Sequence, residues 1–347
     1  MRRAMAKVVG WMAAAPMVVL TLFVLTEPPT WSAAAYVLGA DCCVAALVLV
    51  GRPVARRLAW VGAALVVLTL LGRAVWAKGG SSISANVSGK GSARVVDRLV
   101  DERDLSVNAA RAIAWTRFMG DPDVPELADA MRSAYDDMAQ DEPDAPSPVV
   151  ATYMGLERPG ASDTVEIPAE HPTDAAAIFL HGYAGNFTMS CWLFASAAKR
   201  ANVTTVCPST RWIGDWWTPE GESTVREALA SLRARGMRRI YLAGLSNGAI
   251  GASRLATRIR GLDGLILISG AAPDAASPGI PTLVIQGRSD AQIPAALVHG
   301  YAERAGARYV ELDAGHFAML TRRARVRDGI GAWLSTQDVR PGSQAMR

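Results

Sequence analysis

Residues 239–260 read RIYLAGLSNGAIGASRLATRIR and contain the pattern Gly-x-Ser-x-Gly at Gly244, Ser246 and Gly248. The apolar run before the pattern favours a β-strand, and the spacing after it favours a helix from Asn247 to Arg260. The two glycines permit a tight turn, so the Ser246 hydroxyl would lie at the helix N-terminus, where the dipole stabilises a developing negative charge. The pattern is typical of a nucleophile, although a structural turn serine also matches it.

The same alternation of short β-rich runs and helical patterns extends on both sides of this stretch. The expected strands are 149–154, 164–167, 176–180, 203–206, 239–243, 265–269, 282–286 and 308–312. The expected helices are 187–200, 223–235, 247–260, 294–305 and 321–334. This order predicts an α/β fold with a mainly parallel sheet flanked by helices. In such sheets functional residues follow the carboxyl ends of the strands.

A serine nucleophile needs a base, and the base needs an acid that orients it. The sequence has 4 His, and only His316 follows the last expected strand. Asp290 follows the preceding strand and is the candidate acid. Asp313 is a rival acid, but it leaves the same strand as His316, three positions earlier. The sequence therefore predicts a catalytic triad of Ser246, Asp290 and His316.

An oxyanion hole needs two backbone N–H groups that point to one place. Asn247, directly after the candidate nucleophile, would supply one of them. His181-Gly182-Tyr183 directly follows the apolar run 176–180. We expect the second N–H from Tyr183, and we interpret His181 as a residue that structures this loop.

These motifs, each after a strand and in this order, resemble those of the α/β-hydrolase superfamily over about residues 149–336. The resemblance implies an esterase-like serine hydrolase with Ser246 as nucleophile, His316 as general base and acid, and Asp290 as its orienting partner. No cofactor and no metal are expected. Only residues 271–280 are available where many members insert a lid, so a large lid is not expected. A peptidase or acyltransferase with the same triad remains open, as does a catalytically silent membrane scaffold.

Two further groups of residues are expected near the same sheet edge. Trp212, Trp216 and Trp217 follow the strand 203–206. They would form an apolar substrate pocket, unless they pack a long loop. Cys191 and Cys207 should also lie at this edge, because in a right-handed crossover the helix begins there and the following strand ends there. In an oxidising compartment they would form a disulfide; the alternative is two buried thiols.

The first eighty residues have a different character. Residues 8–26, 31–50 and 58–77 are each apolar and long enough to cross a bilayer, which predicts three transmembrane helices. Their ends carry Trp11, Trp31, Trp60 and Trp76. A cleaved signal peptide is the alternative for the first segment. Arg73 is expected to reach the lipid headgroups, and Asp41 is either functional or a packing residue.

Charge separates the two parts and predicts their orientation. Residues 1–80 carry a net charge of +6 and the remainder −2, which removes the main support for nucleic-acid binding. Lys and Arg lie in the N-terminal tail and in 51–57, whereas 27–30 has none. The positive-inside rule then places the N-terminus in the cytoplasm and the catalytic domain on the extracytoplasmic side.

The sequence therefore predicts five consecutive parts. These are a membrane anchor at 1–78, a Gly/Ser-rich linker at 79–92, a helical stalk or cap at 93–148, the hydrolase domain at 149–336 and a flexible tail at 337–347. The expected partners are the lipid bilayer and a small-molecule or lipid-like ester. The acyl and alcohol parts of that ester, and any protein partner, do not follow from the sequence.

Overall fold

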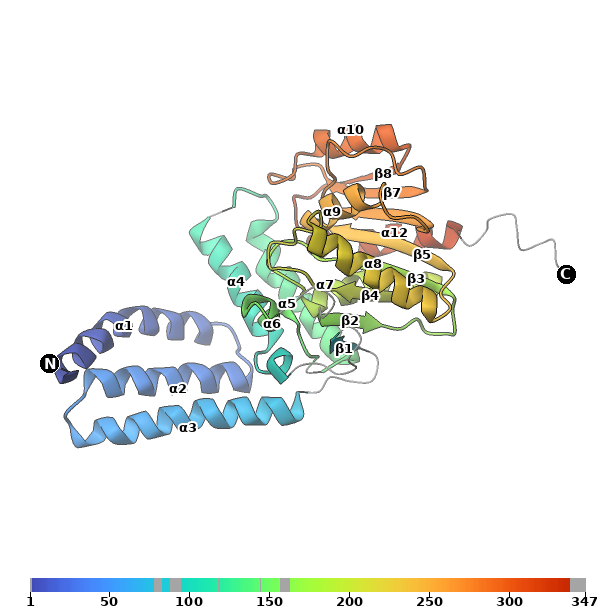
Figure 1. The fold of residues 1–347 in the computed structure, drawn as a ribbon. Helices are drawn as coiled ribbons and strands as arrows, with labels where there is room; N and C mark the ends of the chain where they lie inside the picture. The colour runs from blue at the N-terminus through green and yellow to red at the C-terminus, as the bar shows by residue number, and fades with distance from the viewer. Residues whose placement is uncertain are drawn as a thin grey trace.

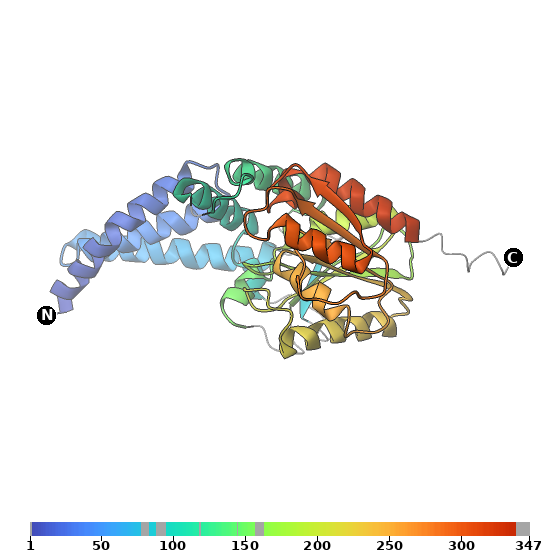
Figure 2. The same ribbon diagram turned by 90° about the horizontal axis from the view of Figure 1, so that it is seen from above.

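The computed structural model of the 347-residue chain describes residues 2–77, 83–87, 95–117, 119–143, 145–156 and 163–337. Three long helices extend from one side of an α/β domain, and a helical hairpin lies between them and the sheet (Figures 1 and 2). Most of the predicted linker and of the predicted tail lies outside the described residues. Within the linker, Ser84–Val87 forms a strand, β1, that the sequence did not predict.

The sheet has eight strands in the order β1-β2-β4-β3-β5-β6-β7-β8. After β1, its strands are β2 (Asp163–Ile167), β3 (Ala175–Leu180), β4 (Thr204–Pro208), β5 (Arg239–Leu245), β6 (Gly264–Ile268), β7 (Thr282–Gly287) and β8 (Arg308–Leu312). Strand β2 is antiparallel to both of its neighbours, β1 and β4, and all other pairs are parallel. The mainly parallel sheet predicted from the sequence is confirmed.

Helices cover both faces of this sheet, since alternate strand residues point to opposite sides. The helices of the domain are α7 (Thr188–Ala198), α8 (Pro219–Ala234), α9 (Asn247–Leu255), α10 (Ala295–Ala305), α11 (Ala318–Thr321) and α12 (Arg323–Gln337). Phe179 points to the face covered by α7, α11 and α12, whereas Ile178 and Leu180 point to the face covered by α8, α9 and α10. Because both faces are buried, the central strands are almost continuously apolar.

The N-terminal helices are α1 (Arg2–Leu25), α2 (Trp31–Val48) and α3 (Pro53–Trp76). All three are long and apolar enough to cross a membrane, judged by length and composition. They pack closely at glycines. A Cβ atom added to Gly62 would lie 2.6 Å from the carbonyl oxygen of Gly39, so no larger residue fits at the crossing of α2 and α3. Small residues at such crossings are typical of helices that pack within lipid.

Two charged residues of these helices have polar partners. The Thr21 hydroxyl lies 3.0 Å from both carboxylate oxygens of Asp41 and joins α1 to α2. Arg73 is buried, and its Nε donates to the carbonyl oxygen of Arg98 at 2.8 Å. The expectation that Arg73 reaches the headgroups is wrong, because its guanidinium finds acceptors inside the protein and ties α3 to the chain that follows.

The helical hairpin consists of α4 (Glu102–Thr116) and α5 (Val124–Asp141), and α5 packs against α7 and α11. Glu102 is buried and accepts hydrogen bonds from the backbone N–H groups of Thr188 and Met189, at 2.7 and 2.8 Å. Its carboxylate therefore caps the N-terminus of α7. Burial raises the pKa of Glu102, although these hydrogen bonds and that of Ser147 favour the charged form.

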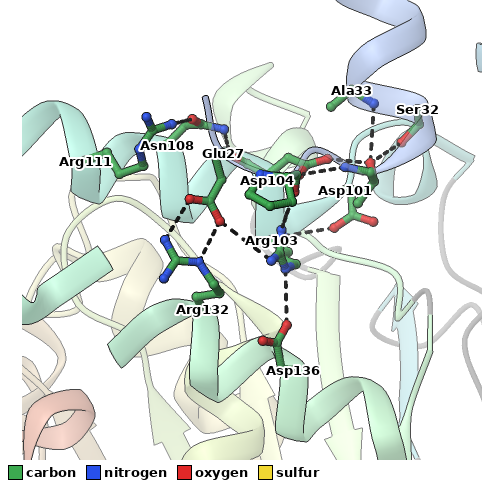
Figure 3. A network of polar contacts seen from close by, with 12 residues as sticks. Glu27, Ser32, Ala33, Asp101, Arg103, Asp104, Asn108, Arg111, Arg132 and Asp136 are labelled. Carbon is green, nitrogen blue, oxygen red and sulfur yellow. Dashed lines mark hydrogen bonds and ion pairs between the residues drawn. The ribbon is translucent and has the colours of Figure 1, made fainter. Parts of the chain in front are cut away.

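The hairpin is also bound to the N-terminal helices through a network of charged groups (Figure 3). The Glu27 carboxylate, between α1 and α2, accepts from Nε and from a terminal nitrogen of Arg132 at 2.6 and 2.7 Å. The hydrogen bond from Arg132 lowers the pKa of Glu27. Arg111 donates to the carbonyl oxygen of Phe23 at 2.7 Å and lies 4.4 Å from the centre of its ring. The three helices are thus held to the hairpin by buried and half-buried polar contacts.

The expected strand at 149–154 is wrong, because Val149–Tyr153 forms a short helix, α6. Short apolar runs do not distinguish a buried helix from a strand. Here Val149 and Thr152, one helical turn apart, face the loop after β3. A Cβ atom added to Gly185 in that loop would lie 3.3 Å from Val149 Cγ2 and 3.4 Å from Thr152 Cγ2.

Candidate active site

Ser246 occupies the tight turn between β5 and α9. Its backbone has φ 54° and ψ −119°, a conformation that L-residues rarely adopt. Two glycines make the turn possible, since a Cβ atom added to Gly248 would lie 2.0 Å from the carbonyl oxygen of Leu180, and one at Gly244 would lie 2.3 Å from Gly248. The backbone N–H of Ser246 donates to Ile268 in β6 at 2.9 Å. The nucleophile candidate is therefore held rigidly at the carboxyl edge of the sheet.

The structure brings Ser246, His316 and Asp290 together from three separate loops. His316 Nε2 lies 2.8 Å from Ser246 Oγ, and His316 Nδ1 lies 2.8 Å from Asp290 Oδ2. The three residues follow β5, β8 and β7, and adjacent parallel strands end side by side at this edge. The rival acid Asp313 is exposed, and its backbone carbonyl accepts from Arg322.

Asp290 is buried and surrounded by hydrogen-bond donors. Gln286 Nε2 donates to Oδ2 at 2.8 Å, and the backbone N–H groups of Gln292 and Ile293 each donate to Oδ1 at 2.8 Å. Burial alone would raise the pKa of Asp290, but the His316 contact and these hydrogen bonds outweigh it, and the pKa lies below its usual value. A charged Asp290 keeps the Nδ1 proton on His316 and leaves Nε2 free to accept.

The two segments expected to supply the oxyanion hole lie next to Ser246. Among the described residues, no acceptor is found for the backbone N–H of Tyr183 or for that of Asn247. Gly182 lies against Ser246, because a Cβ atom added there would be 3.1 Å from Ser246 Cβ. The side chain of Asn247 donates instead to the carbonyl oxygen of Ile213 at 2.8 Å, which fixes the neighbouring loop.

His181 is buried beneath this loop, and its ring nitrogens bond to backbone groups rather than to Ser246. Its Nδ1 lies 2.8 Å from the carbonyl oxygen of Gly182, and its Nε2 accepts from the backbone N–H of Thr210 at 3.1 Å. Burial lowers the pKa of His181 to about 4. The residue therefore acts as a neutral structural link between the loops that follow β3 and β4.

The three tryptophans expected to form one pocket are placed separately. Trp216 is fully buried, packs against Gly251 and donates from Nε1 to the carbonyl oxygen of His181 at 2.9 Å, so its assignment to a substrate pocket is wrong. A large indole is most stable where its ring is packed and its N–H is bonded. Trp217 lies beneath the guanidinium of Arg254, 5.7 Å from it. Only Trp212 is exposed near the site, with its ring 5.0 Å from that of Tyr183.

Cys191 of α7 and Cys207 of β4 form a disulfide, with Cα atoms 6.0 Å apart. A small apolar cavity of about 80 Å³ lies between α7 and His316. It is lined by Ser190, Leu193, Leu245, His316, Phe317, Met319 and Leu320.

In the described part of the chain, no group of three or more His, Cys, Asp and Glu residues is arranged to hold a metal ion.

Asp121, in the connection between α4 and α5, was not identified from the sequence. Its Oδ2 accepts from the backbone N–H groups of His316 at 2.8 Å and Ala291 at 3.2 Å, and its Oδ1 accepts from Asp123 at 3.0 Å. One buried carboxylate thus binds the two loops that carry His316 and Asp290. Gly315 leaves room for it, since a Cβ atom there would lie 2.0 Å from Asp121 Oδ1. The sequence signal was only a pair of acids in a loop, which is usually a solvated turn.

Comparison with known proteins adds the following. No protein-family model matches the sequence, and the comparison with curated proteins finds no match. Similar solved structures include Est1E from Butyrivibrio proteoclasticus, at 14% identity and TM-score 0.46, which covers 53% of this chain and 98% of that one. An α/β serine hydrolase homologue from Coxiella burnetii has 18% identity and TM-score 0.44, with 50% of this chain and 92% of that one covered.

A third similar structure is XC6422 from Xanthomonas campestris, described as an α/β serine hydrolase without a lid. It has 22% identity and TM-score 0.44, and the match covers 53% of this chain and 92% of that one. The α/β-hydrolase fold of the present chain rests on its own sheet order and on the turn at Ser246. Between β6 and β7, residues 269–281 form a short connection without a helix.

Proposed function

We propose that the chain is a membrane-anchored serine hydrolase that cleaves a carboxylic ester through an acyl-enzyme on Ser246. The observation that carries the proposal is the unbroken hydrogen-bonded series Asp290–His316–Ser246 at the N-terminus of α9, with both distances at 2.8 Å. Such a series supplies a base, its orienting acid and a nucleophile in reach of one another.

The reaction follows from this geometry. His316 Nε2 takes the hydroxyl proton while Ser246 Oγ attacks the ester carbonyl carbon. The backbone N–H groups of Tyr183 and Asn247 receive the negative oxygen of the tetrahedral intermediate. The C–O bond to the alcohol then breaks, and His316 gives its proton to the leaving oxygen. A water molecule, deprotonated by His316, attacks the acyl carbon and releases the acid and free Ser246.

Water access favours hydrolysis over acyl transfer. Transfer to another alcohol requires that water be excluded, and the short connection at residues 269–281 provides no lid between β6 and β7. The site is flanked instead by exposed side chains such as Tyr183 and Trp212. A peptidase with the same triad is the second candidate, and the assay below separates the two.

The proposed location combines the three apolar helices with the charge pattern of the sequence. The bases at the N-terminal tail and at residues 51–57 support a cytoplasmic location for these two ends of the bundle. The catalytic domain then lies on the extracytoplasmic side. The disulfide between Cys191 and Cys207 supports this placement, since such bonds persist in oxidising compartments. A reporter active only outside the cytoplasm, fused after Arg347, should be active.

A fluorophosphonate probe tests the chemistry directly, because it reacts only with an activated serine. We expect labelling of the purified full chain and no labelling of Ser246→Ala, with Ser231→Ala on the exposed surface of α8 as the matched control. Turnover of an aryl ester without turnover of peptide amides would favour the esterase over the peptidase. Labelling of Ser246→Ala as strong as wild type would refute the proposal.

A further inference from the structure

Large exposed apolar side chains outside α1–α3 gather at one edge of the domain. Six of them, which we call the apolar rim, are Trp115, Tyr153, Met154, Tyr183, Trp212 and Ile213. Their exposed fractions run from 39% for Ile213 to 74% for Trp115. Scattered apolar residues are ordinary on a protein surface, but a set grouped around one site marks a surface of interaction.

The rim lies on both sides of the candidate nucleophile. On one side, the side-chain amide of Asn247 holds the carbonyl of Ile213, and Trp212 packs on Tyr183. Tyr153 and Met154 lie next to this group, because α6 packs against Gly185 of the loop that contains Tyr183. On the other side, Trp115 lies in the last turn of α4, in the hairpin whose Asp121 binds the His316 loop.

The carboxyl edge of the sheet, where Ser246 lies, faces the N-terminal helices. The outer ends of α2 and α3 contact the segment before α4: the Tyr36 hydroxyl donates to Leu99 at 2.7 Å, and Arg73 donates to Arg98. A few residues further on, Glu102 caps α7 at the carboxyl edge of the sheet. In both views the long helices extend from that side of the domain, opposite the C-terminus (Figures 1 and 2).

Trp115 indicates where the apolar rim lies along the long axes of α1–α3. Arg111 stacks on Phe23, at the end of α1, and Trp115 is one helical turn beyond Arg111 on the same face of α4. Trp115 is therefore about one helical turn from the contact between α4 and the end of α1, a helix able to cross a membrane. Tryptophan at this level is typical of the membrane–water interface.

We propose that the apolar rim rests on the surface of the bilayer that α1–α3 cross, and that the substrate is an ester-bearing lipid presented there. The part that concerns the substrate rests on the proposed ester hydrolysis. The bilayer is the partner of the apolar rim because the three helices hold the domain against it, and because the rim continues from the junction with those helices. Ser246 then opens toward the hydrated headgroup region, so an ester there reaches it without leaving the membrane, and water for deacylation remains present.

The position of the rim is tested without any activity. In the full chain with Cys42→Ala and Cys43→Ala, a fluorophore is attached to Trp115→Cys or Met154→Cys, and the protein is placed in phosphatidylcholine vesicles. We expect nitroxide lipids labelled near the headgroup to quench both positions but not Ala234→Cys, which lies exposed before β5 at the opposite edge. Equal quenching at all three positions, or none at 115 and 154, would overturn the proposal.

The substrate class is tested with two esters of the same fluorogenic alcohol, a soluble acetate and a long-chain ester in the vesicles. For Trp115→Glu with Met154→Glu we expect kcat/KM to fall about tenfold on the vesicle ester, equal to about 1.4 kcal/mol of binding. Turnover of the acetate should not change, and Ala234→Glu should affect neither ester. A parallel loss on both esters, or no loss on either, would reject the lipid substrate. If wild type cleaves neither ester, the hydrolase proposal fails, while the quenching result still decides the placement.

Discussion

The candidate site and the junction with the N-terminal helices are both built from buried polar groups, but they are assembled differently. At the site, Ser246, Asp290 and His316 each follow a strand of one rigid sheet. At the junction, Glu27 meets Arg132 from 105 positions away through two flexible side chains. The first arrangement depends mainly on a correct sheet, whereas the second depends on the docking of several helices.

This difference predicts how each region responds to mutation. Main-chain positions in a sheet are set by many neighbours, so a change at the site should alter chemistry with little effect on folding. Long side chains at the junction are held by few contacts, so a change there should loosen the attachment with little effect on chemistry. Asp121 belongs to both regions, since it comes from the hairpin and binds the loops of the site.

The largest effect is expected at the triad. Ser246→Ala or His316→Ala should lower kcat on a soluble aryl ester by on the order of 10⁴-fold, since each removes a participant in the reaction. Thermal unfolding should stay close to wild type. Near-normal turnover of His316→Ala would show that another group is the base.

The next effect concerns His181 and the dependence of stability on pH. Its folded pKa is about 4, below the ordinary 6.5, because of burial. The unfolded chain therefore binds a proton at this histidine more readily than the folded chain does. As a result, the free energy of unfolding falls as the pH drops from 6.5 toward 4. The expected fall is about 1.4 kcal/mol per pH unit and about 3 kcal/mol in all.

The measurement is urea unfolding at several pH values for wild type and His181→Gln. The variant should be less stable at pH 7 and should lose less stability on acidification, since it lacks the titrating group. An equal loss in both proteins would show that carboxylates alone cause the acid sensitivity.

A smaller effect is expected for Asp121→Asn. An asparagine amide has one acceptor oxygen where the carboxylate has two. Either the N–H groups of His316 and Ala291 or the N–H group of Asp123 would therefore lose their acceptor. A small displacement of the base should lower kcat by about 10- to 100-fold with little change in KM. Asp313→Asn, on the exposed side of the same loop, is the control and should leave kcat near wild type.

The smallest effect is expected at the junction. A double-mutant cycle of Glu27→Gln and Arg132→Gln should give a coupling energy of about 1 kcal/mol in unfolding experiments, because the arginine is only half-buried. Turnover of a soluble ester should not change. A loss of kcat as large as that of Asp121→Asn would mean that the junction and the site are not separate.

The sequence also predicted part of this structure and missed another part, for identifiable reasons. The order of strands and helices after residue 163, and the place of Ser246, Asp290 and His316 at their ends, follow from local periodicity and chain order. The strand expected at 149–154 is a helix because a short apolar run adapts to its neighbours, and Trp216 is a core residue because it fits beside Gly251.

By itself the sequence determined an α/β domain with a Ser–Asp–His arrangement, preceded by three helices able to cross a membrane. These features depend on patterns within a few residues, on the strand order and on the length of apolar segments. Only the tertiary structure decided that Arg73 turns inward, that Asp121 holds the His316 loop, and that the exposed apolar side chains border one sheet edge. These features join segments far apart in the chain, and no local spacing specifies which distant side chains will meet.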